Sequence, residues 1–80
     1  MTHTILRLPA VKAATGLSRS TLYLRIGQRA FTHPVSLGGR AVGWPAHEVA
    51  ALNSARIAGR SDADIRALVR TLEAARKAAA

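Results

Sequence analysis

The apolar and polar positions at the start of the chain predict a short helix that stops at a glycine. Residues 8–15 are mostly apolar or small, and Pro9 suits the first helical turn, where its missing N–H costs no hydrogen bond. Gly16 suits the left-handed position that commonly follows the last helical residue. We therefore expect about two turns of helix here, which are too short to be stable without a partner.

A second helix is predicted directly after this turn. Ser18 is a natural N-cap, and Leu17 before it can pack on Leu22 as a hydrophobic staple. Leu22 and Ile26 lie four residues apart, so they share the face that we expect to be buried. The helix should end within residues 27–29. Two short helices joined by a glycine-containing turn indicate a helix-turn-helix.

The pattern then changes from helical spacing to alternation. In residues 34–37 and 41–44, apolar side chains alternate along the chain, as they do in strands. Between these segments, Gly38 and Gly39 permit the positive φ angles of a tight hairpin turn, and Arg40 places a positive charge at its tip. A hairpin with a basic tip beside a helix-turn-helix indicates a wing.

Two further helices are predicted after the hairpin. Pro45, placed at the first helical position, opens a third helix that runs toward Ile57 and stops at Gly59. Ser61 then begins a capping motif for a last helix over residues 62–77. The apolar side chains of that last helix fall on one stripe: Ile65, Leu68, Val69, Leu72 and Ala75.

The C-terminal stripe must be buried against another apolar surface. It either folds back on the preceding residues or pairs with its copy in a second chain, and neither spacing nor charge decides between these alternatives. Glu73 and Lys77 are spaced for an i,i+4 ion pair. The pattern as a whole predicts a mainly α fold with a small β-hairpin. It comprises a winged helix-turn-helix over residues 1–59 and a C-terminal amphipathic helix over residues 60–80.

The charge distribution adds a functional hypothesis to this fold. The 80 residues carry 12 Lys and Arg against 4 Asp and Glu, a formal charge of +8. Residues 1–47 contain six basic side chains and no acid, because Glu48 is the first carboxylate. A one-sided basic surface of this kind favours a polyanionic partner. A general contribution to solubility is the alternative explanation, and it accounts poorly for so long an acid-free stretch.

Most catalytic and cofactor chemistry has no candidates in this sequence. The chain has no cysteine and only 3 histidines, widely spaced, so neither thiolate chemistry nor a structural zinc site is expected. It has no glycine-rich phosphate loop, and its serines and histidines form no nucleophile signature. No apolar run approaches the roughly 20 residues of a membrane-spanning helix. We expect a cytoplasmic, nucleoid-associated protein that is not an enzyme and needs no metal or cofactor.

The candidate chemistry is binding to double-stranded DNA, with contacts at two places. A serine cap at residue 18 puts the next residues in the first turns of the second helix, where recognition helices meet base edges and phosphates. The candidates on this helix are Ser18, Arg19, Ser20, Thr21, Tyr23 and Arg25. The candidates at the wing are Gly38, Gly39 and Arg40. Arginine binds guanine or phosphate through paired donors, and hydroxyl groups fit backbone oxygens.

Several of these side chains also have a purely structural interpretation. Ser18 can serve as a cap alone, and Arg19 can belong to a solvated helix face. Tyr23 can close the small core, whereas Arg25 lies nearer the side of the helix that carries Leu22 and Ile26. Arg40 can be an ordinary exposed turn residue.

The order and spacing of these motifs resemble those of the AlpA family, over roughly residues 5–58. The matching residues are Leu6–Pro9, Thr15–Tyr23, Phe31, Pro34–Trp44, Glu48 and Val49. AlpA proteins are small regulators from phages and mobile elements, related to excisionases and to the winged-helix DNA-binding domain of MerR proteins. The resemblance assigns the recognition helix to Ser18–Arg25 and the wing to Leu37–Val42. One position departs from the family pattern, because Arg29 stands where the family usually has glycine, which puts the end of the second helix in question.

This resemblance implies a transcriptional regulator that binds promoter or attachment-site DNA near integrase and excision genes. A recombination directionality factor, which favours excision by bending DNA, is the first alternative. A protein-interaction module with an acidic partner is the second, and it follows from the basic surface alone. A domain this small contacts few base pairs, so specific recognition implies two or more protomers on repeated half-sites. An integrase is a further expected partner.

Overall fold

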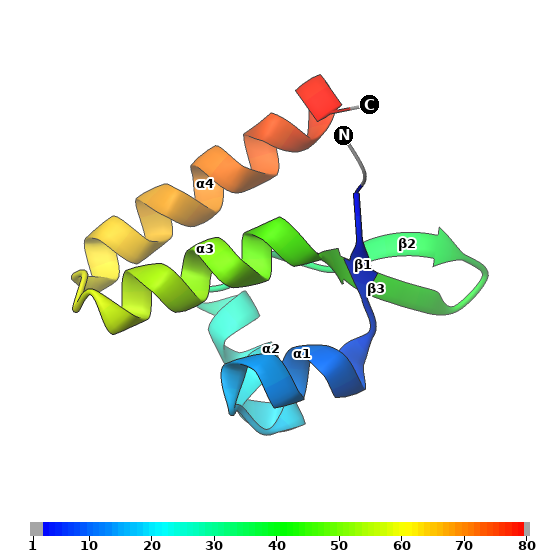
Figure 1. The fold of residues 1–80 in the computed structure, drawn as a ribbon, viewed down its shortest axis with the longest axis horizontal. Helices are drawn as coiled ribbons and strands as arrows, with labels where there is room; N and C mark the ends of the chain where they lie inside the picture. The colour runs from blue at the N-terminus through cyan, green and yellow to red at the C-terminus, as the bar shows by residue number, and fades with distance from the viewer. Residues whose placement is uncertain (1–2, 80) are drawn as a thin grey trace.

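The computed structural model describes residues 3–79, which form helices and short strands (Figure 1). In chain order they are β1 (Ile5–Leu6), α1 (Leu8–Thr15), α2 (Arg19–Gly27), β2 (Val35–Gly38), β3 (Ala41–Pro45), α3 (Ala46–Ile57) and α4 (Asp62–Ala79). The fold is mainly helical with a small hairpin, as predicted. Its arrangement is compatible with a winged helix-turn-helix that carries an additional C-terminal helix.

The turn between α1 and α2 forms as the sequence predicts. Gly16 has a φ of 72° and donates its N–H to Lys12 O at 2.9 Å, which closes α1. Ser18 caps α2, since its Oγ accepts a hydrogen bond from the N–H of Thr21 at 3.2 Å. Leu22 on α2 is fully buried, and its partner in the predicted staple, Leu17, packs against the core. These contacts fix the turn that joins the two helices.

The end of α2 lies where it was expected, but an arginine occupies its left-handed position. The N–H of Ala30 donates to Arg25 O at 2.8 Å and the N–H of Arg29 donates to Ile26 O at 3.0 Å, the hydrogen bonds of a Schellman motif. Arg29 has a φ of 60° and is the one non-glycine residue with positive φ within residues 3–79. This conformation costs a side-chain-bearing residue roughly 1–2 kcal/mol.

The hairpin belongs to a three-stranded antiparallel sheet of order β1-β3-β2, and β1 is a strand that the sequence did not predict. β1 pairs with the end of β3, where Leu6 lies opposite Trp44. On the other edge, β2 pairs with β3 through an irregularity between Ser36 and Gly38, so the predicted alternation is interrupted in β2. Gly43 of β3 faces both neighbours so closely that an added Cβ would collide with Ile5.

The third helix begins one residue later than predicted. Pro45 is the last residue of β3 and the N-cap of α3, rather than its first helical residue. Its extended conformation, with ψ at 130°, lets the strand run directly into the helix. At the other end, Gly59 has a φ of 74° and closes α3, and the Oγ of Ser61 accepts a hydrogen bond from the N–H of Asp64 to begin α4.

The apolar stripe of α4 is covered within the same chain. Ile65 is fully buried and Val69 is 3% exposed, while Leu68 and Leu72 pack against the edge of the core. Ala75, which was expected to belong to this stripe, is exposed. The nine buried hydrophobic residues form one cluster: Val11, Leu22, Ala30, Phe31, Trp44, Val49, Leu52, Ile65 and Val69. One core thus joins α4 to the helix-turn-helix and the sheet.

An ionic network fastens α4 near its C-terminal end. The carboxylate of Glu48 is fully buried and accepts two hydrogen bonds from Arg76, at 2.8 Å from Nε and 2.6 Å from Nη2. These bonds raise the pKa of the Arg76 guanidinium, against the opposing effect of its burial. Arg76 Nη2 also donates to His33 O at 2.7 Å. Glu73 lies 2.7 Å from Nδ1 of His33 and forms this pair instead of the predicted one with Lys77.

Candidate nucleic-acid interface

Helix α2 leaves a mixed polar and apolar surface open to solvent. Ser20 is exposed, Thr21 is half-buried, and Leu24, one turn after Ser20, is 59% exposed. The Oγ of Ser18 lies 3.0 Å from Oγ1 of Thr21 and already accepts the bond from its N–H, so Ser18 is chiefly engaged in capping. The side chains available to a ligand in the first turns are therefore those of residues 19–21.

Arg19 and Tyr23 form a pair on the side of α2 that faces the sheet. The guanidinium carbon of Arg19 lies 5.6 Å from the centre of the Tyr23 ring, a cation–π arrangement. The Tyr23 ring in turn meets Trp44 edge to face, with centroids 6.4 Å apart. Tyr23 is 39% exposed, so it combines a core contact with a surface that solvent can reach. Trp44 is buried and cannot stack on a base, because its Nε1 donates to Thr32 O at 3.0 Å inside the core.

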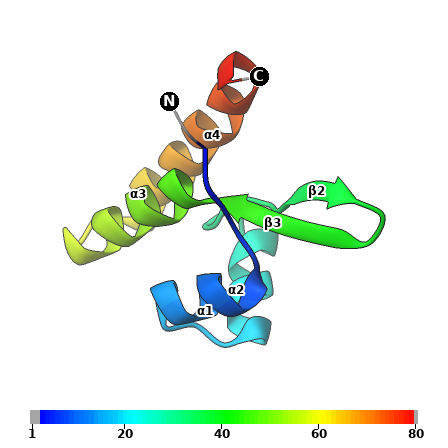
Figure 2. The same cartoon turned by 45° about the vertical axis from the view of Figure 1, so that its right-hand side comes forward.

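The β2–β3 hairpin is called the wing below. The candidates at the wing occupy its turn. Gly38 and Gly39 have φ angles of 103° and 55°, conformations that favour glycine. Arg40 follows them and is exposed. In Figure 2 the wing extends away from the helices to the right, with α2 below its base and α4 above it. Arg40 is thus the one positively charged residue at the turn of the wing.

Arg25 lies on a different side of α2 from Arg19 and Tyr23. It is half-buried and faces the end of α3, where it lines hollows together with Arg56. The structure thus separates the candidates into two groups. Arg19 and Tyr23 are on the sheet side of α2, and Arg25 is on the side of the α3–α4 corner.

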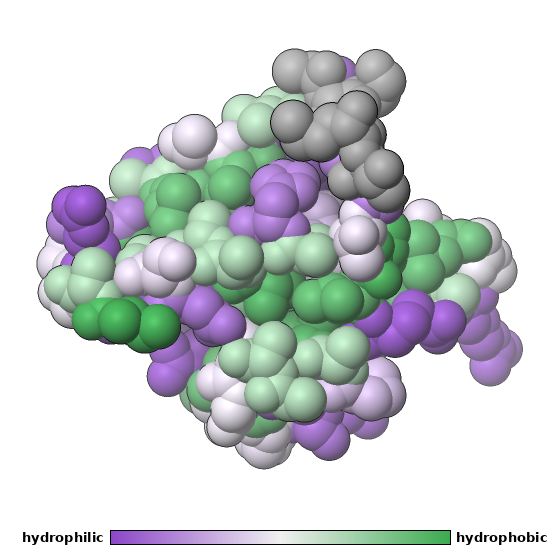
Figure 3. All heavy atoms as spheres, viewed as in Figure 1, coloured by the Kyte–Doolittle hydropathy of each residue, from purple (hydrophilic) through white to green (hydrophobic). Residues whose placement is uncertain are grey.

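The charged side chains of the two halves of the chain differ in whether they form ion pairs. Within residues 3–79, no ion pair involves the six basic side chains that precede Glu48: Arg7, Lys12, Arg19, Arg25, Arg29 and Arg40. Three of the four carboxylates form ion pairs, and all three belong to α3 or α4. Figure 3 shows hydrophilic side chains along the lower edge and the tip of the wing. The acid-free half therefore presents uncompensated positive charge.

Two features of this surface were missed by the sequence analysis. Leu24 was not considered because leucine suggests a core position, although its offset from Leu22 and Ile26 places it on the opposite face of the helix. Arg66 of α4 was assigned to a separate segment, and its Nε donates to Gln28 O at the end of α2 at 3.1 Å. Only the folded-back position of α4 reveals the second contact, and no local pattern in the sequence encodes it.

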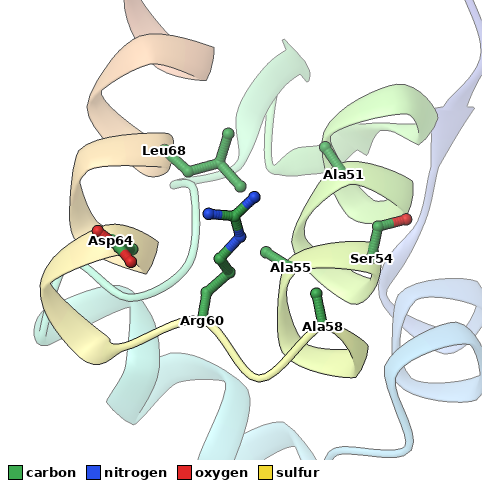
Figure 4. Close-up of a pocket in the computed structure, with 7 residues that line it drawn as sticks. All are labelled: Ala51, Ser54, Ala55, Ala58, Arg60, Asp64 and Leu68. Atoms are coloured by element: carbon green, nitrogen blue, oxygen red, sulfur yellow. The ribbon is translucent and has the colours of Figure 1, made fainter.

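A larger hollow lies elsewhere, away from α2 and the wing. It is an open groove of about 600 Å³ between α3 and α4 (Figure 4). Its lining consists of Ala51, Ser54, Ala55, Ala58, Arg60, Asp64 and Leu68, and Arg60 extends into it between the two helices. In the part of the chain that the structure describes, no group of His or acidic residues could hold a metal ion. None of the helices described is both long and apolar enough to cross a membrane.

The fold and its charge distribution define a small basic protein of the helix-turn-helix type with a wing. The chain belongs to the AlpA family: residues 4–56 match the family described as Prophage CP4-57 regulatory protein (AlpA). The resemblance predicted from the sequence is thereby confirmed, and the chain is a member of a family of regulatory proteins.

A curated relative comes from a phage. Residues of this chain are 51% identical over 55 positions to the uncharacterized protein ORF88 of Enterobacteria phage P4. The match spans 69% of this chain and 62% of the phage protein. No solved structure matches the chain significantly.

Proposed function

We propose that this protein is a sequence-specific DNA-binding transcriptional regulator, encoded by a prophage or an integrative element and acting on integrase or excision genes. The observation that carries the proposal is the uncompensated positive charge of residues 3–47, of which Arg19 and Arg25 lie on α2 and Arg40 lies on the wing. Membership of a family of regulatory proteins supports the same proposal. In this proposal α2 enters a major groove, and Arg40 meets the neighbouring backbone or minor groove.

The individual side chains have distinct roles in this mechanism. Arg19 and Ser20 contact base edges or phosphates from the first turn of α2, and Thr21 and Tyr23 offer hydroxyls to backbone oxygens. Gly38 and Gly39 contribute no contact chemistry, but they allow the turn that presents Arg40. Because one protomer covers few base pairs, two or more protomers bind repeated half-sites. Such a protein works in the cytoplasm, on the nucleoid.

A salt titration of DNA binding tests the proposal. We compare the Arg19→Ala/Arg40→Ala variant with Arg60→Ala/Lys77→Ala, which removes the same charge from the α3–α4 connection and the end of α4. Fluorescence anisotropy would be measured on a mixed-sequence duplex and on DNA flanking the gene and any nearby integrase gene. Loss of two phosphate contacts should lower the slope of log K against log salt by about 1.8, and the affinity by roughly 50-fold near 0.1 M salt. The control variant should keep its slope.

Three other results have defined meanings. If the Arg19→Ala/Arg40→Ala variant folds and keeps full affinity, the assigned surface is wrong. If the wild-type protein binds every duplex weakly and equally, operator recognition is excluded, and the alternative of an acidic protein partner takes its place. If binding is specific but gel shifts on attachment-site DNA show a ladder of bent complexes, the protein is an excision factor that acts with the integrase rather than a promoter regulator.

A further inference from the structure

The two flanks of α2 face different surroundings. Tyr23 lies on the flank that meets Trp44 and the sheet. Thr21, Arg25 and Gln28 follow the i, i+4, i+7 spacing, so they share the opposite flank. Along that opposite flank runs a depression of about 240 Å³, whose other side is formed by Arg56, Asp62 and Arg66. We call it the basic depression.

The basic depression carries excess positive charge. Arg25, Arg56 and Arg66 bring three guanidinium groups from three different helices, against the single carboxylate of Asp62. Asp62 lies 3.6 Å from Nη1 of Arg56, and its side chain is 76% exposed, so this pair is weak. Two positive charges therefore remain, in a place where no other carboxylate lines the wall.

One guanidinium in the depression is already held in place. Arg66 Nε donates to the backbone oxygen of Gln28 at 3.1 Å, and this is the one hydrogen bond of the Arg66 side chain within residues 3–79. The bond fixes the planar group beside the last turn of α2 and leaves its two terminal nitrogens available. A guanidinium with two available nitrogens is suited to the paired hydrogen bonds that phosphate oxygens accept.

The basic depression lies where the second phosphate backbone of a major groove would pass if α2 occupied the groove. A helix is about 10–12 Å wide with its side chains, and the groove is about 12 Å wide, so a helix inside it has a phosphate backbone on each side. The wing is assigned to one of these backbones. The basic depression lies on the opposite flank of α2, where the other strand passes.

We propose that the basic depression binds a backbone phosphate of DNA on the strand opposite the wing, with Arg66 as the main ligand. The inference rests on the proposed DNA-binding function and extends the site beyond residues 4–56, the segment that matches the family. Helix α4 then has two roles: its apolar face completes the core, and its arginine completes the clamp on the groove.

The test compares two neutralising variants that remove one charge each from the same region. Arg66→Gln acts in the basic depression, whereas Arg60→Gln acts in the groove between α3 and α4, where Arg60 points away from α2 (Figure 4). Affinity for a fluorescein-labelled mixed-sequence duplex is measured over a range of salt concentrations. Arg66→Gln should lower the salt slope by about 0.9 and the affinity by about 5- to 10-fold near 0.1 M salt. Arg60→Gln should leave the slope unchanged.

Two further measurements separate a phosphate contact from a structural effect. Arg66→Lys keeps the charge, so its salt slope should equal that of the wild type even if the paired geometry is lost. Single neutral methylphosphonates, placed one at a time along each strand, should weaken wild-type binding at every phosphate that the protein contacts. At one of these positions they should leave Arg66→Gln unaffected.

The outcomes distinguish this inference from the proposed function. If the wild type binds DNA and the Arg66→Gln slope equals that of Arg60→Gln, the inference is overturned and the function stands. If no methylphosphonate position couples to Arg66, the same conclusion follows. If the wild type binds no duplex at all, both fail together.

Discussion

Residues 3–47 and residues 48–79 use charge in opposite ways. The first region has six basic side chains without a carboxylate partner, and it is held together by helix caps, strand pairing and apolar packing. In the second region, acidic side chains form ion pairs with basic ones, and the shortest is the pair between Glu48 and Arg76. Ion pairs here fasten α4, whereas the unpaired cations of the first region include those that we propose bind DNA. Stability and binding should therefore respond to different substitutions.

The largest expected effect is the loss of the buried ion pair. Arg76→Leu leaves the carboxylate of Glu48 buried without a partner, which should lower the free energy of unfolding by about 3–5 kcal/mol. Urea denaturation followed by circular dichroism measures it. The double variant Glu48→Leu/Arg76→Leu should recover most of the loss, because it removes both charges together. A double variant as unstable as the single one would contradict this explanation.

The pH dependence of the same pair has a definite sign. The pKa of Arg76 is raised in the folded protein, so protonated Arg76 favours folding. Its contribution is complete at pH values below the ordinary arginine pKa, and it is lost only as the pH rises through the raised folded value. Between neutral and mildly alkaline pH, the difference in stability between the wild type and Glu48→Leu/Arg76→Leu, which keeps neither charge, should therefore stay constant.

The first region should instead be sensitive to shape. Gly43 lies between β1 and β2, and a Cβ there would collide with the side chain of Ile5 and lie 3.0 Å from the backbone oxygen of Leu6. Gly43→Ala should therefore cost about 1–3 kcal/mol, measured by urea denaturation. The loss should be the same at low and high salt, since no charge is involved. Gly27→Ala, at a site with open space around it, is the matched control and should not destabilise the protein.

The ends of α2 and α3 allow the comparison to be made within one motif. Both close with Schellman hydrogen bonds, but Arg29 occupies the left-handed position of α2 where Gly59 occupies that of α3. Arg29→Gly should stabilise the protein by about 0.5–1 kcal/mol, because relief of the left-handed strain exceeds the entropy that glycine adds to the unfolded chain. Gly59→Arg should destabilise it by about 1 kcal/mol.

DNA binding supplies a second measurement on Arg29. One explanation for an arginine at this strained position is that its charge contributes to DNA binding. In that case Arg29→Gly should bind DNA more weakly, by less than the 5- to 10-fold expected for a direct phosphate contact. Thermal unfolding and anisotropy on the same sample check both effects. Arg29→Gly with unchanged affinity would show that the arginine has no part in binding.

The sequence predicted the local structure well because most of it is determined by adjacent residues. Gly16 and Ser18 fix the turn between the helices, and Gly38 and Gly39 fix the wing, through conformations that few other residues adopt. The two-residue strand β1 was not predictable, since its pairing with β3 joins residues about forty positions apart. Family membership was predictable from motif order, but the DNA contacts themselves remain predictions.

The surroundings of α2 could not be derived from local patterns either. The proximity of Arg66 to Gln28 depends on where α4 packs, and periodicity left open whether its stripe folds back. Glu73 pairs with His33 instead of Lys77 for the same reason, because His33 comes close to Glu73 only in the folded chain. Sequence spacing identifies which faces are apolar, whereas the pairing of charged side chains follows from tertiary packing.

The smallest expected effect concerns a buried hydroxyl where the two regions meet. Thr32 is fully buried, and within the described residues its Oγ1 has no hydrogen-bond partner, in contrast to the fully bonded carboxylate of Glu48. Thr32→Val keeps the shape and removes the unpaired group, so it should raise the free energy of unfolding by up to about 1 kcal/mol. The bond from Trp44 Nε1 to the backbone oxygen of Thr32 is unaffected by this change. Thr32→Ala is the control: it removes the same hydroxyl but leaves a cavity, and should not stabilise. Urea denaturation of both variants decides, because a loss of stability in Thr32→Val would mean that the hydroxyl has a partner in solution.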